Sequence, residues 1–249
     1  VTKYETYDKD IPVVKGLFDT RMGVTDRDIV CATCNQKNTC CPGHFGHIEL
    51  AKPVLNYQFI QTTLKLLKCV CFKCSKLLID KESEICKLIS KKPSTVRWAQ
   101  VYNLCSKIKT CGQETVDGCG AKQPSNYKVD GVVGINLHWK EESVPEIKEL
   151  MDVDVIKQIL ERISNDDSYF MGFDPAWCRP EWLICSVLPV PPPSVRPSVK
   201  QDNSQRMDDD LTHKLSDILK ANITLQKKID TNAKNEIIQD WINVLQYHV

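Results

Sequence analysis

The sequence predicts an α+β fold with irregular cysteine-rich loops, short strands and a C-terminal pair of packed helices. Three observations support this prediction. Thirteen cysteines crowd a chain of 249 residues, several of them in C-x-x-C pairs. Short apolar runs with alternating or helical period follow these pairs, and the last forty residues have the spacing of two helices that pack on each other. With 42% apolar residues, the chain can bury a core as one large domain or two smaller units.

Composition excludes several classes of protein. The sequence has no run of eighteen apolar residues, so we expect no membrane span, and its start lacks the pattern of a signal peptide. Because the first residue is Val1, we expect the chain to be a fragment. An odd number of cysteines in C-x-x-C pairs, without a secretory signal, favours bound metal over disulfides and a reducing compartment.

Charge is distributed unevenly along the chain. The formal net charge is +1, but residues 61–130 hold 13 basic against 6 acidic side chains and residues 131–249 hold 13 against 19. A basic middle segment is typical of a surface that meets a polyanion, although a solvated lysine-rich surface is the ordinary alternative. The candidate phosphate contacts in this segment are Lys87, Lys91, Lys92, Arg97, Lys107 and Lys109. No aromatic series interleaves with them, so base recognition is not expected.

The first half of the chain is expected to contain few regular elements. The first thirty residues carry turn signals and little periodicity, so we expect an irregular segment. Alternation over His47–Pro53 predicts a short strand, and apolar spacing over Tyr57–Lys68 predicts a helix. A second helix is predicted over Ser94–Lys107.

The next segment alternates between strands and loops. Residues 129–139 have a strand pattern with glycine interruptions, and a helix is predicted from Asp152 or Asp154, either of which could cap it, to about Ile163. Residues 166–180 are expected to form a loop, and residues 182–188 a strand. Five prolines in residues 189–197 predict an extended polyproline II path. We interpret it as a rigid strut between two packed parts, with an SH3-type ligand as the alternative.

The C-terminal residues predict two antiparallel helices. Steps of three and four residues connect Leu211, Leu215, Ile218, Asn222, Leu225 and Ile229. A second stretch from Ile237 to His248 repeats this spacing after a polar link at residues 230–235. Three carboxylates at residues 208–210 precede the first helix and are interpreted as its cap, with magnesium ligation as the alternative.

Two groups of side chains have the spacing of zinc ligands. Zinc prefers four tetrahedral ligands, and a C-x-x-C turn supplies two thiolates from one bend. Cys31-x2-Cys34 is followed after six residues by Cys41-x2-His44, which predicts a first structural zinc site. Cys40 and His47 are left over. Because four protein ligands fill the shell and no general base adjoins them, catalysis at this metal is not expected.

The second group is less compact. Cys71-x2-Cys74 needs a distant partner pair, for which Cys111-x7-Cys119 is the best candidate. The competing cysteines are Cys69, Cys86 and Cys105. A thioredoxin-like redox role for Cys71 and Cys74 is the alternative, but no βαβ pattern surrounds them.

These strings resemble a known family. Residues 31–53, with Cys-Pro-Gly-His-Phe-Gly-His at 41–47, are similar to the N-terminal zinc motif of the largest subunit of multisubunit DNA-dependent RNA polymerases, the eukaryotic counterpart of bacterial β′. The resemblance continues in order through residues 71–78, 118–124, 179–182, 188–197 and 209–222. The sequence departs from the family in the extra Cys40 and Cys69 and in the region between residues 77 and 110, where no string matches.

The resemblance implies a zinc-stabilised clamp, a mobile module that closes over downstream DNA and the RNA/DNA hybrid. It implies zinc ligands Cys31, Cys34, Cys41 and His44 at the first site, and Cys71, Cys74, Cys111 and Cys119 at the second. It also implies four consecutive segments: 1–60 with the first zinc site, 61–130 as a basic clamp head with the second, 131–200 as clamp core with the proline strut, and 201–249 as the helical pair of that core.

The same resemblance implies partners and a reaction. The full enzyme is a nucleotidyltransferase whose catalytic magnesium loop, Asn-Ala-Asp-Phe-Asp-Gly-Asp, does not occur in this sequence, so no catalytic residue is expected here. The implied partners are DNA, the hybrid and other polymerase subunits, notably the second-largest, with no membrane. The implied location is the nucleus, or the cytoplasm or virion for a large DNA virus. One rival interpretation is a RING-like or other zinc-ribbon adaptor for a protein partner, which predicts interleaved ligand pairs and no salt-dependent nucleic-acid binding. The other is a cysteine or zinc hydrolase.

Overall fold

The computed structural model describes residues 1–129, 134–141, 144–200 and 206–249. The chain forms two compact units. One combines residues 1–52 with residues 186–249, and the other comprises residues 53–185. The paired strands β3 (Gly46–Leu55) and β7 (Ile184–Val190) run from one unit into the other. The units therefore divide the chain differently from the four consecutive segments expected from sequence, because both ends of the chain share one unit.

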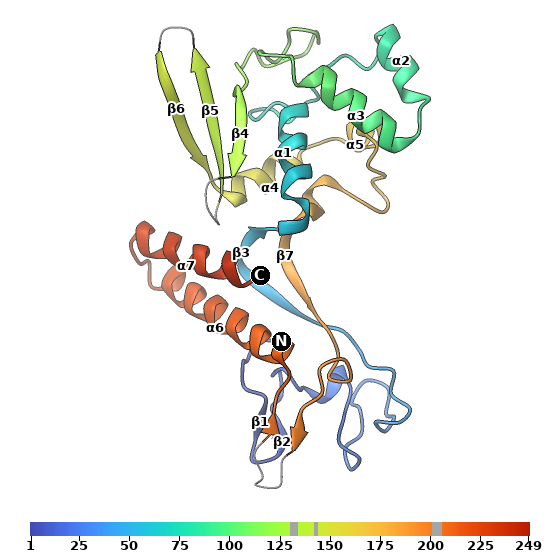
Figure 1. The fold of residues 1–249 in the computed structure, drawn as a ribbon, viewed down its shortest axis with the longest axis vertical. Coiled ribbons are helices and arrows are strands. Elements are labelled where there is room, and N and C mark those ends of the chain that lie inside the picture. The colour runs from blue at the N-terminus through green and yellow to red at the C-terminus, as the bar shows by residue number, and fades with distance from the viewer. Residues whose placement is uncertain (130–133, 142–143, 201–205) are drawn as a thin grey trace. The chain divides into compact units, whose positions relative to one another are not determined.

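Residues 53–185 contain a three-stranded sheet and five α-helices among the described residues (Figure 1). The antiparallel sheet has the order β4 (Asn126–Val129), β5 (Ile135–Glu141) and β6 (Val144–Met151). The helices are α1 (Ile60–Cys69), α2 (Glu84–Ser90), α3 (Ser94–Cys105), α4 (Val153–Glu161) and α5 (Asn165–Met171). Short 3-10 turns, η2 (Tyr57–Phe59) and η3 (Pro180–Leu183), precede α1 and β7. One apolar core, which includes Leu66, Ile135 and Ile156, joins sheet and helices.

The predicted elements of this unit are largely confirmed. The helices predicted at 57–68, 94–107 and 152–163 form as α1, α3 and α4. The strands predicted at 47–53 and 182–188 correspond to β3 and to β7, which begins at Ile184 after η3, and both strands extend into the other unit. The strand predicted over 129–139 corresponds to β5, and its residues 130–133 lie outside the described part of the chain. Asp152 occupies the N-cap of α4, but its side chain makes no capping hydrogen bond.

The loop predicted over residues 166–180 is wrong in its first part. Residues 165–171 form α5, because Ser164 Oγ accepts a hydrogen bond from the Asp167 N–H at 3.0 Å. Gly172 ends the helix in the left-handed conformation, with φ of 104°. Both end signals are present in the sequence, but the helix is only seven residues long and its apolar period is too short to detect.

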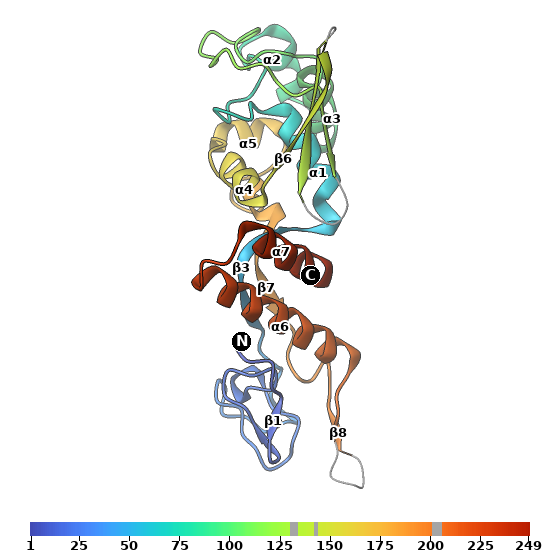
Figure 2. The ribbon, with the colours of Figure 1, turned by 90° about the vertical axis from the view of Figure 1, so that its left-hand side faces the viewer.

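The other unit has a core built from both ends of the chain. Its N-terminal part contains the short pair β1 (Tyr7–Asp8) and β2 (Ile11–Pro12) and the 3-10 turn η1 (Thr20–Met22). Its C-terminal part contains the pair β8 (Val199–Lys200) and β9 (Arg206–Met207), followed by α6 (Asp210–Asp230) and α7 (Asn235–His248), visible in Figure 2. Leu17, Phe18, Ile48, Leu215 and Leu219 lie in the shared core.

The predicted pair of C-terminal helices is confirmed. Asn222, the polar residue among the predicted apolar positions, hydrogen-bonds to the backbone of β3. Leu215, Ile218 and Leu225 are buried, whereas Leu211 is half exposed. Asn222 Nδ2 donates to the Glu49 carbonyl at 2.9 Å, and its Oδ1 accepts from the Ala51 N–H at 2.7 Å. This side chain therefore extends the hydrogen bonding of β3. The expected cap is confirmed for Asp209, whose Oδ2 accepts from the Leu211 N–H at 3.1 Å.

The extended proline strut is wrong. The backbone turns after Pro192, where the N–H groups of Val195 and Arg196 donate to the carbonyls of Pro192 and Pro193. The buried guanidinium of Arg196 then donates to the carbonyls of Pro191 and Leu17, inside the unit formed by the chain ends. The prolines therefore brace one unit rather than separate two parts.

Candidate metal centres

The first cysteine pair lies in a tight turn. The N–H of Cys31 donates to the Gln36 carbonyl at 3.0 Å, and the N–H of Asn35 donates to the Cys31 carbonyl at 2.9 Å. Asn35 adopts a left-handed conformation with φ of 56°, which asparagine tolerates better than most residues. This turn directs the side chains of Cys31 and Cys34 to one point.

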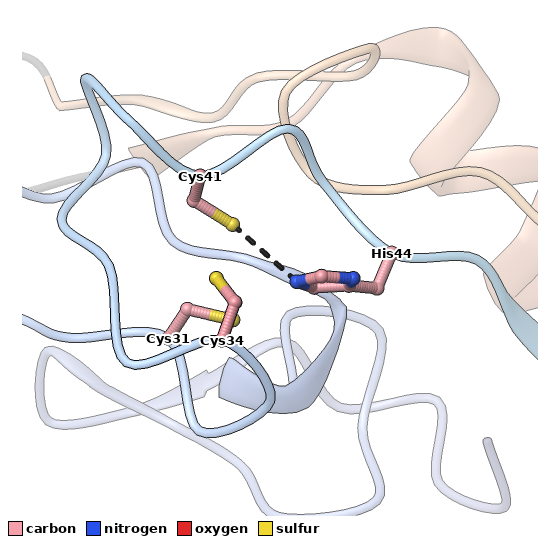
Figure 3. A group of neighbouring side chains, drawn as sticks. All are labelled: Cys31, Cys34, Cys41 and His44. Carbon is pink, nitrogen blue, oxygen red and sulfur yellow. Dashed lines mark hydrogen bonds between the residues drawn. The ribbon is translucent and has the colours of Figure 1, made fainter.

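The second pair of the first group comes from the following loop. Its Cys41 N–H donates to the Lys37 carbonyl at 2.9 Å, and the His44 N–H donates to the Met22 carbonyl at 2.9 Å. Figure 3 shows the three sulfur atoms and the imidazole facing one another. Gly43 lies against the proline turn, because a Cβ there would stand 2.8 Å from two side-chain carbons of Pro192.

The second group repeats the first turn. The N–H of Cys71 donates to the Lys76 carbonyl, the N–H of Ser75 donates to the Cys71 carbonyl, and Ser75 has φ of 61°. A distant loop supplies the other pair, since the Cys111 N–H donates to the Ala121 carbonyl at 2.9 Å. The structure therefore brings Cys111 and Cys119, the predicted partner pair, to Cys71 and Cys74.

The distances within each group fit a tetrahedral zinc ion. Bond lengths of about 2.3 Å to sulfur and about 2.0 Å to imidazole nitrogen give separations of roughly 3.8 Å between sulfurs and roughly 3.5 Å between sulfur and nitrogen. Cys41 Sγ lies 3.7 Å from His44 Nε2, Cys71 Sγ lies 3.6 Å from Cys119 Sγ, and Cys74 Sγ lies 3.7 Å from Cys111 Sγ. All donor atoms of a group lie within 4.8 Å of one another. Each group could therefore hold one metal ion.

The thiol pKa values within each group differ widely. At Cys31, burial raises the pKa, but hydrogen bonds from the backbone of Cys34 and Thr33 outweigh it and lower the value to about 7. The backbone N–H of Ala121 lowers the pKa of Cys119 to about 7, whereas burial raises that of Cys111 to about 12. Because a thiol with a raised pKa is protonated at pH 7, metal binding at the second group would release protons.

The remaining cysteines and His47 take no part in either group. Cys40 is exposed, and His47 is exposed with its Nε2 3.8 Å from Glu49 Oε1. The competitors Cys69, Cys86 and Cys105 are buried in the core of residues 53–185. Among the described residues, these two groups of four are the clusters able to hold a metal.

The expected phosphate contacts do not all suit that role. Arg97 is buried, donates to the carbonyls of Ser90 and Tyr169 at 3.1 and 3.0 Å, and lies over the Tyr169 ring. Its assignment as a phosphate contact is wrong, because its guanidinium fastens α3 to α5. The five lysines are exposed. Of these, Lys87 pairs with Glu82 at 3.3 Å, and Lys92 Nζ donates to Gln100 Oε1 at 3.1 Å.

Two groups that hydrogen-bond to residues of the candidate metal sites were not predicted, because the spacing of Cys and His residues contains no information about them. One is the Met22 carbonyl, which η1 presents to the first group. The other is the side chain of Gln123, which contacts Cys71.

Asp19 starts η1, and its carboxylate accepts hydrogen bonds from the Arg21 backbone N–H and guanidinium and from the Lys15 N–H.

Replacing Asp19 by asparagine is expected to destabilise the unit formed by the chain ends at pH 7. Hydrogen bonds from Arg21 lower the pKa of Asp19 from 3.8 to about 2, so its stabilisation is present above pH 3.8 and lost as pH falls towards 2. The Arg21 side chain is 58% exposed, so solvent screens its interaction with Asp19. We therefore expect Asp19→Asn to lower the free energy of unfolding at pH 7 by about 1 to 2 kcal/mol. Denaturant unfolding of both proteins at pH 7 and near pH 2 measures it.

The difference between the two proteins is the informative quantity, since acid weakens the metal groups of both alike. It should shrink as pH falls, and a constant difference would contradict the assigned pKa. The exposed Asp28 provides the control, because Asp28→Asn should have no comparable effect at either pH.

No helix in the described part of the chain has both the length and the apolar character required to span a bilayer.

Comparison with known proteins identifies the family. The family model described as RNA polymerase Rpb1, domain 1, matches residues 1–249. The DNA-directed RNA polymerase subunit Rpo1N of Methanocaldococcus jannaschii is 41% identical over 98% of this chain, and the DNA-directed RNA polymerase II subunit RPB1 of Euplotoides octocarinatus is 42% identical over all of it. The chain spans 18% and 53% of the length of these relatives. It therefore belongs to the Rpb1 domain 1 family, the N-terminal region of the largest RNA polymerase subunit.

Proposed function

We propose that this chain is a clamp segment of the largest subunit of a DNA-directed RNA polymerase and holds template DNA and the RNA/DNA hybrid during transcription. The observation that carries the proposal is the coincidence of family membership with two closed groups of four metal ligands. Each group would hold one structural Zn²⁺, which cross-links a C-x-x-C turn to a second loop.

The proposed role of the chain is structural. Each group offers four protein donors, so no coordination position is left for a reacting water. Nucleotide transfer and its magnesium ions would belong to parts of the enzyme outside this sequence. Other polymerase subunits, notably the second-largest, are the proposed protein partners, and the nucleus is the proposed location, or the cytoplasm or virion for a viral enzyme.

Exposed lysines in residues 53–185 are the proposed contacts to phosphate. Lys91, Lys107 and Lys109 are exposed, and they belong to the basic stretch of residues 61–130, proposed as the clamp head. Phosphate contacts of this kind release counterions, so binding should weaken steeply with salt.

A RING-like adaptor is less well supported. Its ligand pairs would interleave along the sequence, whereas here Cys31, Cys34, Cys41 and His44 all precede Cys71. The two groups are therefore sequential.

Metal content and X-ray absorption test the zinc assignment. We expect two zinc ions per chain, one with three sulfurs and one nitrogen and one with four sulfurs.

Duplex DNA binding as a function of salt tests the clamp role. Replacing Lys107 and Lys109 together by alanine should reduce the slope of log binding constant against log salt concentration by roughly 0.9 per lost phosphate contact. Lys227→Ala on α6 is the control. An unchanged slope in the double variant would contradict the proposed contacts.

A further inference from the structure

The side chain of Gln123 lies beside the second metal group and satisfies three hydrogen bonds there. Its Nε2 donates to Cys71 Sγ at 3.2 Å and to the Ala121 carbonyl at 2.9 Å. Its Oε1 accepts from the Phe72 N–H at 3.3 Å. One amide thus connects the Cys71–Cys74 turn to the loop that carries Cys111 and Cys119.

Charge gives the contact to sulfur a specific consequence. With Zn²⁺ bound, three thiolates and a neutral imidazole at the first group leave a net charge of −1, whereas four thiolates at the second leave −2. Cys71 is fully buried, so water cannot stabilise its thiolate. An N–H donor at 3.2 Å therefore replaces the missing solvent and withdraws charge from the sulfur.

The first group has a backbone donor in the equivalent place. The N–H of Thr33 lies 3.4 Å from Cys31 Sγ, the first cysteine of that turn. At the second group, a side chain supplies the bond to Cys71. Unlike a backbone N–H, this donor can be removed by substitution.

We propose that Gln123 is a positioning residue of the second metal site that also sets the charge on the Cys71 thiolate. This inference rests on the proposed occupancy of that site by zinc. Gln123 does not ligate the metal: it orients Cys71 by the bonds to Phe72 and Ala121, and it stabilises the bound thiolate by the N–H···S bond.

Two substitutions separate the electrostatic role from simple fastening of the loops. Gln123→Glu retains an acceptor for the Phe72 N–H but replaces the Nε2 donor, which serves both Cys71 Sγ and the Ala121 carbonyl, by a carboxylate oxygen. Gln123→Leu loses every polar contact without adding charge. If fastening alone matters, leucine should be at least as harmful as glutamate; if the charge on Cys71 matters, glutamate should be clearly worse.

The test is zinc affinity of the whole chain, measured by competition with a chromophoric chelator, together with the absorption spectrum of the Co²⁺-substituted protein. For the second site, we expect Gln123→Glu to weaken zinc binding by about 10- to 100-fold and Gln123→Leu by less. The sulfur-to-cobalt charge-transfer band should move to lower energy in Gln123→Leu, because the thiolate becomes richer in electrons. Gln113→Leu is the matched control, since Gln113 is exposed and accepts from the Lys109 N–H.

Three outcomes would decide the matter. A larger loss in Gln123→Glu together with the band shift in Gln123→Leu supports the inference. Equal or greater loss in Gln123→Leu, with an unmoved band and two cobalt ions bound, overturns the charge role. If the unsubstituted protein binds no zinc at the second group, the proposed site itself fails, and this inference fails with it.

Discussion

Replacing Cys41 by serine is expected to release one zinc ion and unfold the loop of residues 24–45, whereas replacing its neighbour Cys40 should change neither. Between Val24 and Phe45 the only buried side chain is Cys31. This loop therefore has no apolar core, so we expect its order to depend on the proposed zinc ion. Apparent zinc-binding energies of roughly 10 to 16 kcal/mol are coupled to folding in such loops, so the loss of one ligand has a large effect.

Metal content per chain and limited proteolysis measure this effect. Arg27 and Lys37 lie in the loop and are exposed, so trypsin should cleave after them much faster in Cys41→Ser than in Cys40→Ser. The second site should keep its zinc in both variants. Two zinc ions and slow cleavage in Cys41→Ser would contradict the first site, and zinc loss in Cys40→Ser would make Cys40 the ligand instead.

The two groups of candidate metal ligands were predictable because their geometry is largely local. A C-x-x-C turn fixes two thiolates through hydrogen bonds within six residues, as around Cys31 and Cys71. Spacing made Cys111 and Cys119 the best partner pair for the second group but left Cys69, Cys86 and Cys105 as competitors. Only the packing of α1 and α3, which end at Cys69 and Cys105, buries these two in the core.

Residues whose role depends on distant contacts were not predictable in the same way. Arg97 lies in a lysine-rich stretch and looks like a surface cation, yet one of its partners, the Tyr169 carbonyl, is 72 residues away. Similarly, the five prolines of residues 189–197 predict an extended path. The turn arises because Arg196 reaches the carbonyl of Leu17, 179 residues away in sequence.

Gly118 and Gly120 flank Cys119, and we expect only the replacement of Gly118 by alanine to release the zinc ion of the second site. A Cβ on Gly118 would lie 2.2 Å from both Cα and N of Gly112 and 2.7 Å from the carbonyl carbon of Cys111. These are backbone atoms, so they cannot move aside as a flexible side chain would. A Cβ on Gly120 would have no atom within 4 Å.

The two substitutions therefore separate steric exclusion from backbone strain. Gly120 has φ of +74°, so Gly120→Ala should cost about 1 to 2 kcal/mol and leave both zinc ions bound. Gly118→Ala should force the 111–119 loop open, separate Cys119 from Cys71 and reduce zinc to one ion per chain. Metal analysis and cobalt spectra distinguish these results.

The first site serves as an internal control in this experiment. It lies in the other compact unit, so its three-sulfur, one-nitrogen absorption signature should persist in Gly118→Ala. Retention of both ions in Gly118→Ala would mean that the loop can close on the metal without the close approach of Gly112 and Gly118. In that case the sulfur atoms, rather than the packing of the loop backbone, would determine how the second site closes.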